Sequence, residues 1–259
     1  MLIKGQNLTY RYPGEPVPLF DSLDFEVRGP GFISLFGLSG TGKSTLARLL
    51  CREIAPETGS ISISAAPVTL YAWNTERFPG WCSVGQHIRD VTPEHNLVSL
   101  DTISEALNVT ALLESRFREL SMGQKNRVNL LRYLLQDFDI LIADEALANV
   151  DEPSRNRILG FIKKSFPEKT FIYISHNATE VARFSKDILI LSVNRPHTNL
   201  KTISGLNMPD ASEPNPEKLK GTVLKLLEAA TADSIAISTP ARPLNSKTET
   251  PSGQVPQET

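Results

Sequence analysis

A glycine-rich stretch, GLSGTGKS at residues 37–44, has residue types and spacing that suit phosphate binding. It follows the apolar run FISLF and precedes TLARLLCRE, so it joins a predicted strand to a predicted helix. Glycines let the backbone wrap, so that successive NH groups and the helix N-terminus can meet phosphate oxygens. Lys43 is placed to reach the β- and γ-phosphates of a nucleotide, and Ser44 to hold Mg²⁺. The alternative is a chance glycine turn before a helix.

Two carboxylates end a second apolar run, ILIADE, which occupies residues 140–145. Asp144 is placed to bind Mg²⁺, directly or through water, and Glu145 to polarise an attacking water. His176 follows the apolar run TFIYIS, at the carboxyl end of a predicted strand, where ligands of parallel sheets gather. Solvent-facing acids and a structural histidine are the alternatives, and the phosphate loop favours the functional roles. Tyr12, in RYPG, is either a packing residue or stacks on a nucleotide base.

The segment ELSMGQKNRV, residues 119–128, is unusual as part of a helix. Gly123 weakens a helix interior, and Ser121 and Gln124 supply no apolar stripe. From Asn129 onward, NLLRYLLQDFDILIADEA is typical of a helix that runs into a buried strand. We therefore expect the Ser121 hydroxyl and the backbone NH groups at this helix start to face something outside the helix.

Strands and helices alternate along most of the chain. The N-terminal region contains three predicted strands, LIKGQNLTYRY, LFDSLDFEVRG and FISLF, separated by glycine and proline turns. Further strands are predicted at GSISIS, ILIAD, TFIYIS and DILILS, and helices around PSRNRILGFIKKSF and ATEVARFS. This alternation predicts an α/β fold with a largely parallel sheet covered on both faces.

The character of the sequence changes near residue 195. We expect residues 1–195 to form one domain, with a helical part at about residues 86–135. Residues 196–238 are a predicted C-terminal extension, in which EKLKGTVLKLLEAATAD spaces its apolar residues like one face of a short amphipathic helix. Residues 239–259 contain no apolar cluster, and their composition predicts disorder.

Composition excludes several classes of function. The 259 residues carry a formal net charge of −2, which provides no electrostatic argument for binding nucleic acid or an anionic membrane. Two cysteines suggest no disulfide framework and favour a cytosolic chain. The N-terminus lacks the apolar run of a signal peptide, and no stretch approaches the roughly 20 apolar residues of a spanning helix. If the protein works at a membrane, another chain is expected to span it.

Together these motifs resemble those of the ATP-binding cassette (ABC) ATPases. GLSGTGKST matches their phosphate loop, LSMGQ their LSGGQ signature, and ILIADEALANVD their strand, catalytic glutamate and D-loop. SHN carries the switch histidine, and Tyr12 stands where the family has its adenine-stacking aromatic. The resemblance covers roughly residues 1–193, with every element in family order. It implies a P-loop NTPase core with a mostly parallel sheet, an N-terminal antiparallel β subdomain and a helical subdomain.

The resemblance also implies ATP and Mg²⁺ as cofactors and assigns residues to them. Catalytic roles fall to Lys43, Glu145 and His176, and metal binding to Ser44, Asp144 and Asn74. The implied nucleotide-binding residues are Tyr12, Gly37, Leu38, Ser39, Gly40, Thr41, Gly42, Lys43, Ser44, Thr45 and Asn74. In this family two cassettes pack head to tail, so that one subunit's signature and D-loop face the nucleotide of the other. The residues implied for that role in trans are Ser121, Met122, Gly123, Gln124 and Asp151.

The sequence departs from the family pattern at several positions. Met122 replaces the first glycine of LSGGQ, and Ala146 stands where a proline usually follows the catalytic glutamate. Asn74 falls where the family has a glutamine, and a plain loop asparagine is the alternative. The interval from Lys43 to Ser121 is shorter than is typical, which predicts a shortened helical subdomain.

The function implied by the resemblance is an ATP-hydrolysing subunit that powers a membrane transporter through ATP-driven dimer closure. Its implied partners are a second ABC subunit, identical or different, and a transmembrane permease subunit, with no nucleic acid. Its implied location is the cytoplasmic face of the inner or plasma membrane. Two alternatives remain: a soluble cassette ATPase that acts on DNA or ribosomes, and a weakly hydrolysing nucleotide-dependent regulator. Met122 and Asn74 motivate the second alternative.

Overall fold

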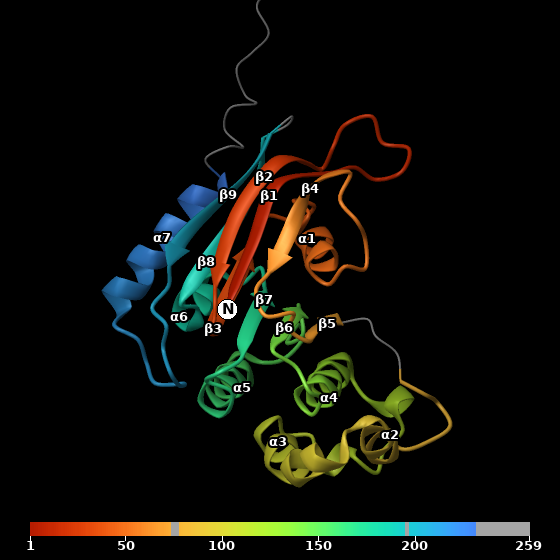
Figure 1. Cartoon of the computed structure of the whole chain (residues 1–259). Helices are drawn as coiled ribbons and strands as arrows, with labels where there is room; N and C mark the ends of the chain where they lie inside the picture. The colour runs from red at the N-terminus through yellow and green to blue at the C-terminus, as the bar shows by residue number, and fades with distance from the viewer. Residues whose placement is uncertain (74–77, 195–196, 232–259) are drawn as a thin grey trace, which may run out of the picture.

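The strands form two sheets in the computed structural model, which describes residues 1–73, 78–194 and 197–231. The smaller sheet, in the order β2-β1-β4, is antiparallel. The larger sheet, in the order β5-β6-β7-β3-β8-β9, is parallel except for β9, so the predicted α/β fold with a mostly parallel sheet is confirmed (Figure 1). The strands are β1 (Leu2–Tyr10), β2 (Phe20–Arg28), β3 (Gly31–Phe36), β4 (Thr58–Ile63), β5 (Thr69–Trp73), β6 (Ile140–Asp144), β7 (Thr170–Ile174), β8 (Asp187–Asn194) and β9 (His197–Ser204).

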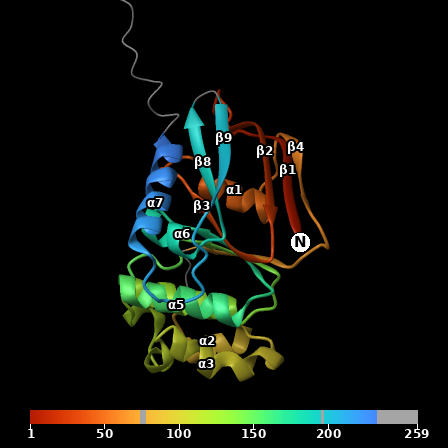
Figure 2. The ribbon, with the colours of Figure 1, turned by 90° about the vertical axis from the view of Figure 1, so that its left-hand side faces the viewer.

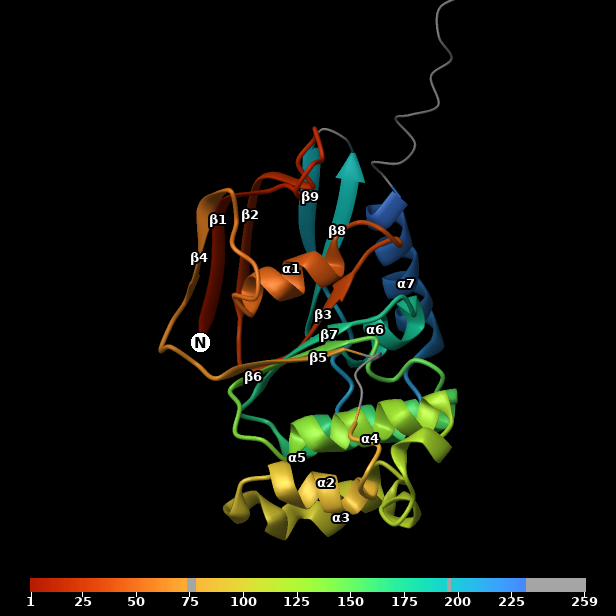
Figure 3. The ribbon, with the colours of Figure 1, turned by 90° about the vertical axis from the view of Figure 1, so that its right-hand side faces the viewer.

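The helices cover both faces of the larger sheet. The α-helices are α1 (Lys43–Leu50), α2 (Val84–Val91), α3 (Leu100–Ala106), α4 (Met122–Leu134), α5 (Glu152–Ser165), α6 (Ala178–Phe184) and α7 (Pro216–Thr231). The described residues also form the short 3₁₀ helices η1 (Glu94–Ser99), η2 (Thr110–Leu112) and η3 (Phe117–Glu119). Helix α1 lies between the two sheets, whereas α2, α3 and α4 gather at one end of the molecule (Figure 3). The bounds predicted for a helical subdomain, about residues 86–135, remain a prediction.

Side chains that alternate along β6 explain why the larger sheet has a core on each face. Ile140 and Ile142 pack into the cluster that α1 shares with the smaller sheet. Leu141 and Ala143, on the opposite face, pack into the cluster formed with α4 and α5. Successive residues of a strand point to opposite faces, and fully burying a branched aliphatic side chain contributes about 1.5–3 kcal/mol. The carboxyl end of β6 is therefore held firmly from both sides.

Two strands of the larger sheet, β5 and β9, were not predicted from the sequence. Strand β9 follows residue 195 and pairs with β8, so the sheet continues into the region assigned to the C-terminal extension. Helix α7 then packs beside α6, with Leu226 and Ala230 against Val181 (Figure 2). The disorder predicted for residues 239–259 concerns a segment outside the described residues, which end at residue 231.

Candidate active site

The phosphate loop closes around the side chain of Lys43. Strand β3 ends at Phe36 and α1 begins at Lys43, and the loop between them turns through Gly40 and Gly42, with φ angles of 79° and 98°. The left-handed region is open to glycine at little cost, which explains the residue type at both positions. The Lys43 ammonium donates hydrogen bonds to the carbonyl oxygens of Gly37 and Leu38, both at 2.9 Å. The loop therefore folds around the Lys43 ammonium at the start of a helix. The positive charge and the helix N-terminus together favour binding of an anion.

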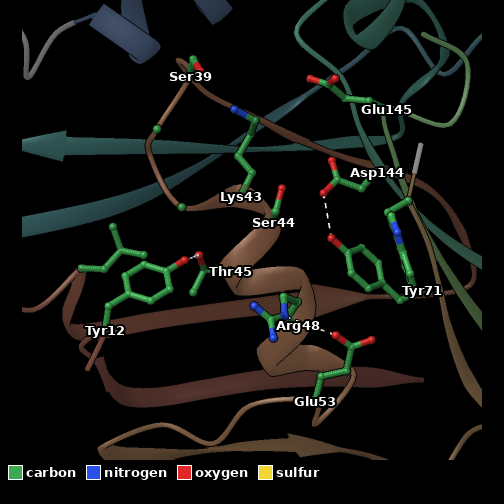
Figure 4. Close-up of a pocket in the computed structure, with 14 residues that line it drawn as sticks. Tyr12, Ser39, Lys43, Ser44, Thr45, Arg48, Glu53, Tyr71, Asp144 and Glu145 are labelled. Carbon is green, nitrogen blue, oxygen red and sulfur yellow. Dashed lines mark hydrogen bonds and ion pairs between the residues drawn. The ribbon is translucent and has the colours of Figure 1, made fainter. Parts of the chain in front are cut away.

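Charge at this loop is balanced by the carboxylates at the end of β6. Burial lowers the pKa of the Lys43 ammonium, whereas the nearby carboxylates of Asp144 and Glu145 act in the opposite direction. Asp144 is 8% exposed, and its Oδ2 accepts a hydrogen bond from the Tyr71 hydroxyl at 2.9 Å. The cation and the acids therefore face one another across a small space, as Figure 4 shows.

Glu145 and His176 form a pair where two strands end. Glu145 adopts a φ of 50°, and its backbone NH donates to the carbonyl oxygen of Ile174 at 3.0 Å. A positive φ is uncommon for a residue with a side chain and is characteristic of functional turns. Here it redirects the chain as it leaves the buried strand. The Glu145 Oε1 atom lies 3.2 Å from Nδ1 of His176, so the two side chains that the sequence predicted to be catalytic meet.

Lys43, Asp144 and Glu145 line one cavity of about 820 Å³. His176 does not line it, and lines instead, with Glu145, a smaller cavity of about 150 Å³. The walls of the larger cavity come from the β1–β2 connection, the phosphate loop and α1, strand β5, and the end of β6. The predicted residues that line it are Tyr12, Ser39, Gly40, Gly42, Lys43, Ser44, Thr45, Asp144 and Glu145. The lining residues that sequence reasoning missed are Leu19, Arg48, Glu53, Tyr71 and Trp73. The alternating run TLYAW could have revealed Tyr71 and Trp73 as neighbours on one face of a strand.

Three predicted residues of the phosphate loop do not line the cavity. Gly37, Leu38 and Thr41 belong to the loop itself, and Thr41 donates a hydrogen bond from its hydroxyl to the Leu38 carbonyl oxygen at 2.9 Å. Gly37 has no room for a side chain, because a Cβ there would lie 2.4 Å from the carbonyl oxygen of Leu191. Asn74, predicted to contact the metal and the nucleotide, lies outside the described residues.

Tyr12 reaches the cavity from the connection between β1 and β2. Its side chain is 40% exposed, and its ring meets that of Tyr10 edge-on, with the centroids 5.2 Å apart. Its hydroxyl hydrogen-bonds the Thr45 hydroxyl on α1 (Figure 4). An exposed ring that is held at both its edge and its tip offers a face on which a planar base could stack.

The signature residues do not line this cavity. Ser121 is the N-cap of α4: its hydroxyl accepts a hydrogen bond from the Gln124 NH at 3.3 Å, and the Gln124 side chain accepts one from the Ser121 NH at 2.8 Å. Such a reciprocal capping box stabilises the helix start, an intrachain role that was not expected from the sequence. Met122 is 51% exposed. Asp151, the predicted D-loop residue, likewise caps α5 by accepting from the Ser154 NH at 2.9 Å.

Gly123 is required by contacts within the chain. A Cβ at this position would lie 2.2 Å from the carbonyl oxygen of Asn149. One turn further along α4, the Asn126 side chain donates to the Ala148 carbonyl oxygen at 2.6 Å. The start of α4 therefore rests directly on the loop that follows Glu145.

We expect Gly123→Ala to destabilise the protein by about 1–3 kcal/mol, the usual range for overpacking a filled site. The matched control is Gly221→Ala in α7, where a Cβ meets nothing within 4 Å. That control should stabilise the protein by about 0.5–1 kcal/mol, because alanine is the better helix former. Thermal unfolding of both variants measures the difference. Equal stability of Gly123→Ala and wild type would contradict the close contact with Asn149.

No helix within residues 1–73, 78–194 and 197–231 is long and apolar enough to cross a bilayer.

Comparison with known proteins identifies the family. Residues 20–148 match the model of the ABC transporter family. The chain is 29% identical to an ATP-dependent lipid A-core flippase of Xylella fastidiosa, over 79% of this chain and 39% of the flippase. It is 31% identical to the molybdenum import ATP-binding protein ModC of Brucella suis, over 64% of this chain and 52% of that protein. The chain thus spans well under two thirds of the length of either relative.

Two further comparisons concern a relative of which this chain covers a larger share, and a solved structure. An uncharacterized ABC transporter ATP-binding protein of Haemophilus influenzae is 27% identical, over 82% of this chain and 90% of that protein. A bacterial Atm1-family ABC exporter, solved with ATP bound, superposes with a TM-score of 0.68 at 22% identity, covering 80% of this chain and 39% of the exporter. At that identity the likeness concerns the fold. The phosphate loop, the paired carboxylates and these matches lead to one conclusion: the chain belongs to the ABC transporter family and carries its ATP-binding cassette.

Proposed function

We propose that this chain is the ATP-hydrolysing subunit of a membrane transporter and that ATP closes a dimer of two such cassettes. The observation that carries the proposal is the cavity that brings the phosphate loop, Asp144 and Glu145 to one space. The relatives named as an import ATP-binding protein and as a flippase support a role in transport. A permease subunit would supply the membrane-spanning part and hold this chain at the cytoplasmic face.

Each side chain at the site has a task that its chemistry suits. Lys43 and the loop NH groups bind the β- and γ-phosphates, and Glu145 accepts a proton from the attacking water. His176 holds Glu145 in place through the contact between Nδ1 and Oε1. The loop and the helix start supply fixed dipoles where negative charge develops. Such electrostatic stabilisation of the transition state is usually the largest single contribution to the rate enhancement.

A divalent cation fits the side chains at one edge of the cavity. The Ser44 hydroxyl and the Asp144 carboxylate are hard oxygen donors, which Mg²⁺ prefers, and both line the cavity. When bound, Mg²⁺ supplies neutralisation of charge on the phosphate oxygens. Asn74 is proposed as a further contact to the cation and the nucleotide.

The signature acts, in this proposal, on the nucleotide of the partner subunit. The cavity of the same chain is not lined by Ser121, Gly123 or Asp151. Ser121 is exposed at the N-terminus of α4. Such a terminus carries a partial positive charge that favours an anionic phosphate. The capping contacts of Ser121 leave its exposed side available to a second subunit.

Purification and turnover test this proposal together. The full chain, expressed with its native neighbours, should co-purify with a multi-span membrane protein and hydrolyse ATP. Turnover without a membrane partner would favour a soluble cassette ATPase that acts on DNA or ribosomes. Nucleotide binding with feeble turnover would favour a regulator, the alternative motivated by Met122 and Asn74.

We expect Tyr12→Ala to weaken ATP binding by about 1–3 kcal/mol, or roughly 5- to 150-fold, through loss of base stacking. Tyr12→Trp should bind normally, because it keeps an aromatic face. Tyr12→Phe removes only the hydroxyl that contacts Thr45 and should also bind ATP nearly as well as wild type. Equilibrium titration with a fluorescent ATP analogue measures these affinities.

The control for Tyr12 is Val17→Ala, which alters an apolar residue of similar exposure in the same connection but outside the cavity. Val17→Ala should leave the affinity unchanged. Equal ATP affinity in Tyr12→Ala and wild type would return Tyr12 to a packing role.

A further inference from the structure

Tyr71 contacts Asp144, one of the two side chains proposed above to hold Mg²⁺. Its hydroxyl donates a hydrogen bond to Oδ2 of Asp144 at 2.9 Å, the one hydrogen bond to this carboxylate among the described residues (Figure 4). Ser44, at the start of α1, lines the same cavity as Tyr71 and Asp144.

The register of two parallel strands places Tyr71 in this position. Strand β5 pairs with β6 so that Tyr71 stands opposite Ile142, and Trp73 stands opposite Asp144. Alternate residues of a strand share a face, so Tyr71, Ile142 and Asp144 all point toward α1. The phenol ring spans the two-residue offset along the strands and brings its hydroxyl to the carboxylate.

The ring of Tyr71 is held in place by packing. It lies against the cluster between the two sheets, and the Trp73 ring packs on it with the centroids 5.5 Å apart.

We propose that Tyr71 is a positioning residue that fixes the rotamer of the Asp144 carboxylate for a divalent cation bound with ATP. A carboxylate can present either oxygen to a cation, and a fixed hydrogen bond to Oδ2 leaves Oδ1 free to face the cavity. Partners of this kind orient metal ligands, and their loss typically costs 10- to 100-fold in metal affinity or activity. The inference rests on the proposed function, because it requires that ATP and Mg²⁺ bind in this cavity.

The test compares ATP affinity with and without the cation in Tyr71→Phe, which keeps the ring and removes the hydroxyl. Fluorescence titration of the full chain with an ATP analogue is run once in EDTA and once in saturating Mg²⁺. In EDTA, Tyr71→Phe should bind as wild type does. In Mg²⁺, it should bind about 10- to 100-fold more weakly than wild type. A purely structural hydroxyl would not produce a loss that depends on the cation.

Tyr173→Phe is the matched control, because the Tyr173 hydroxyl also donates to a buried carboxylate, that of Glu180, at 2.8 Å. Tyr173 lies on β7 and does not line this cavity, so Tyr173→Phe should show no cation-dependent loss. Equal loss in EDTA and in Mg²⁺, or no loss in either, would overturn the proposal for Tyr71. If wild type binds no ATP even in saturating Mg²⁺, the proposed function fails, and this inference fails with it.

Discussion

We expect Glu145→Gln to lower ATP turnover by about 10²- to 10⁴-fold, the usual contribution of a general base. The amide has the size of the carboxylate and can remain beside Nδ1 of His176, which lies 3.2 Å from Oε1. It cannot accept a proton from the attacking water. ATP binding should therefore persist without hydrolysis, and the unhydrolysed nucleotide should hold two cassettes closed. Phosphate release measures turnover, and light scattering measures ATP-dependent dimerisation.

Glu168→Gln provides the control for this substitution. Glu168 is exposed in the connection between α5 and β7 and does not line the cavity, so the same chemical change there should leave turnover intact. Near-normal turnover of Glu145→Gln would exclude Glu145 as the general base. Loss of ATP binding in that variant would instead assign the residue to nucleotide binding.

Mixing Lys43→Ala protein with Ser121→Asp protein should restore the turnover that neither has alone. Lys43 lines the cavity whereas Ser121 does not, so each active site would need the first residue from one subunit and the second from the other. In a head-to-tail heterodimer one site receives both lesions and the other receives neither. Random mixing makes half the dimers mixed, with one intact site of two, so recovery is limited to about a quarter of wild type.

The choice of Ser121→Asp follows from the structure. Ser121 caps α4 through its hydroxyl, and aspartate is an equally good N-cap, so the helix start should be preserved. The added carboxylate would face the γ-phosphate of the partner's nucleotide and repel it. An arginine at this position would remove the cap as well, and its effect could then arise from a frayed helix.

The control mixture combines Lys43→Ala with Glu145→Gln. Both residues line the same cavity of one chain, so every site in a mixed dimer carries one of the two lesions. No turnover should return. Recovery in this mixture, or none in the mixture with Ser121→Asp despite demonstrated subunit exchange, would contradict composite sites. Full turnover of Ser121→Asp alone would remove the signature from the mechanism.

The phosphate loop could be predicted because its information is local. A strand, a glycine turn and a helix start lie within one short segment, and the positive φ angles at Gly40 and Gly42 follow from residue type. The capping residues Ser121 and Asp151 depend equally on a few neighbouring positions, although their capping contacts were not anticipated from the sequence. The α/β class followed from the alternation of strands and helices.

Long-range register decided what the sequence alone did not predict. Tyr71 belongs to the cavity because β5 pairs with β6 in one particular register, although the two strands lie far apart in the chain. Glycine is needed at position 123 because the carbonyl oxygen of Asn149 leaves no room for a Cβ. No pattern of nearby residues indicates this contact. Strand β9 likewise joins the sheet through its pairing with β8.

The sequence by itself determined the α/β class, the phosphate loop and the acidic end of β6, because backbone preferences and capping act over a few residues. Only the tertiary structure decided that Glu145 meets His176, that Tyr71 meets Asp144, and that the signature lies apart from the cavity of its own chain. These contacts depend on the order and register of strands, which are set by burying both faces of the larger sheet at once. Many distant residues share in that burial, and so no single segment specifies it.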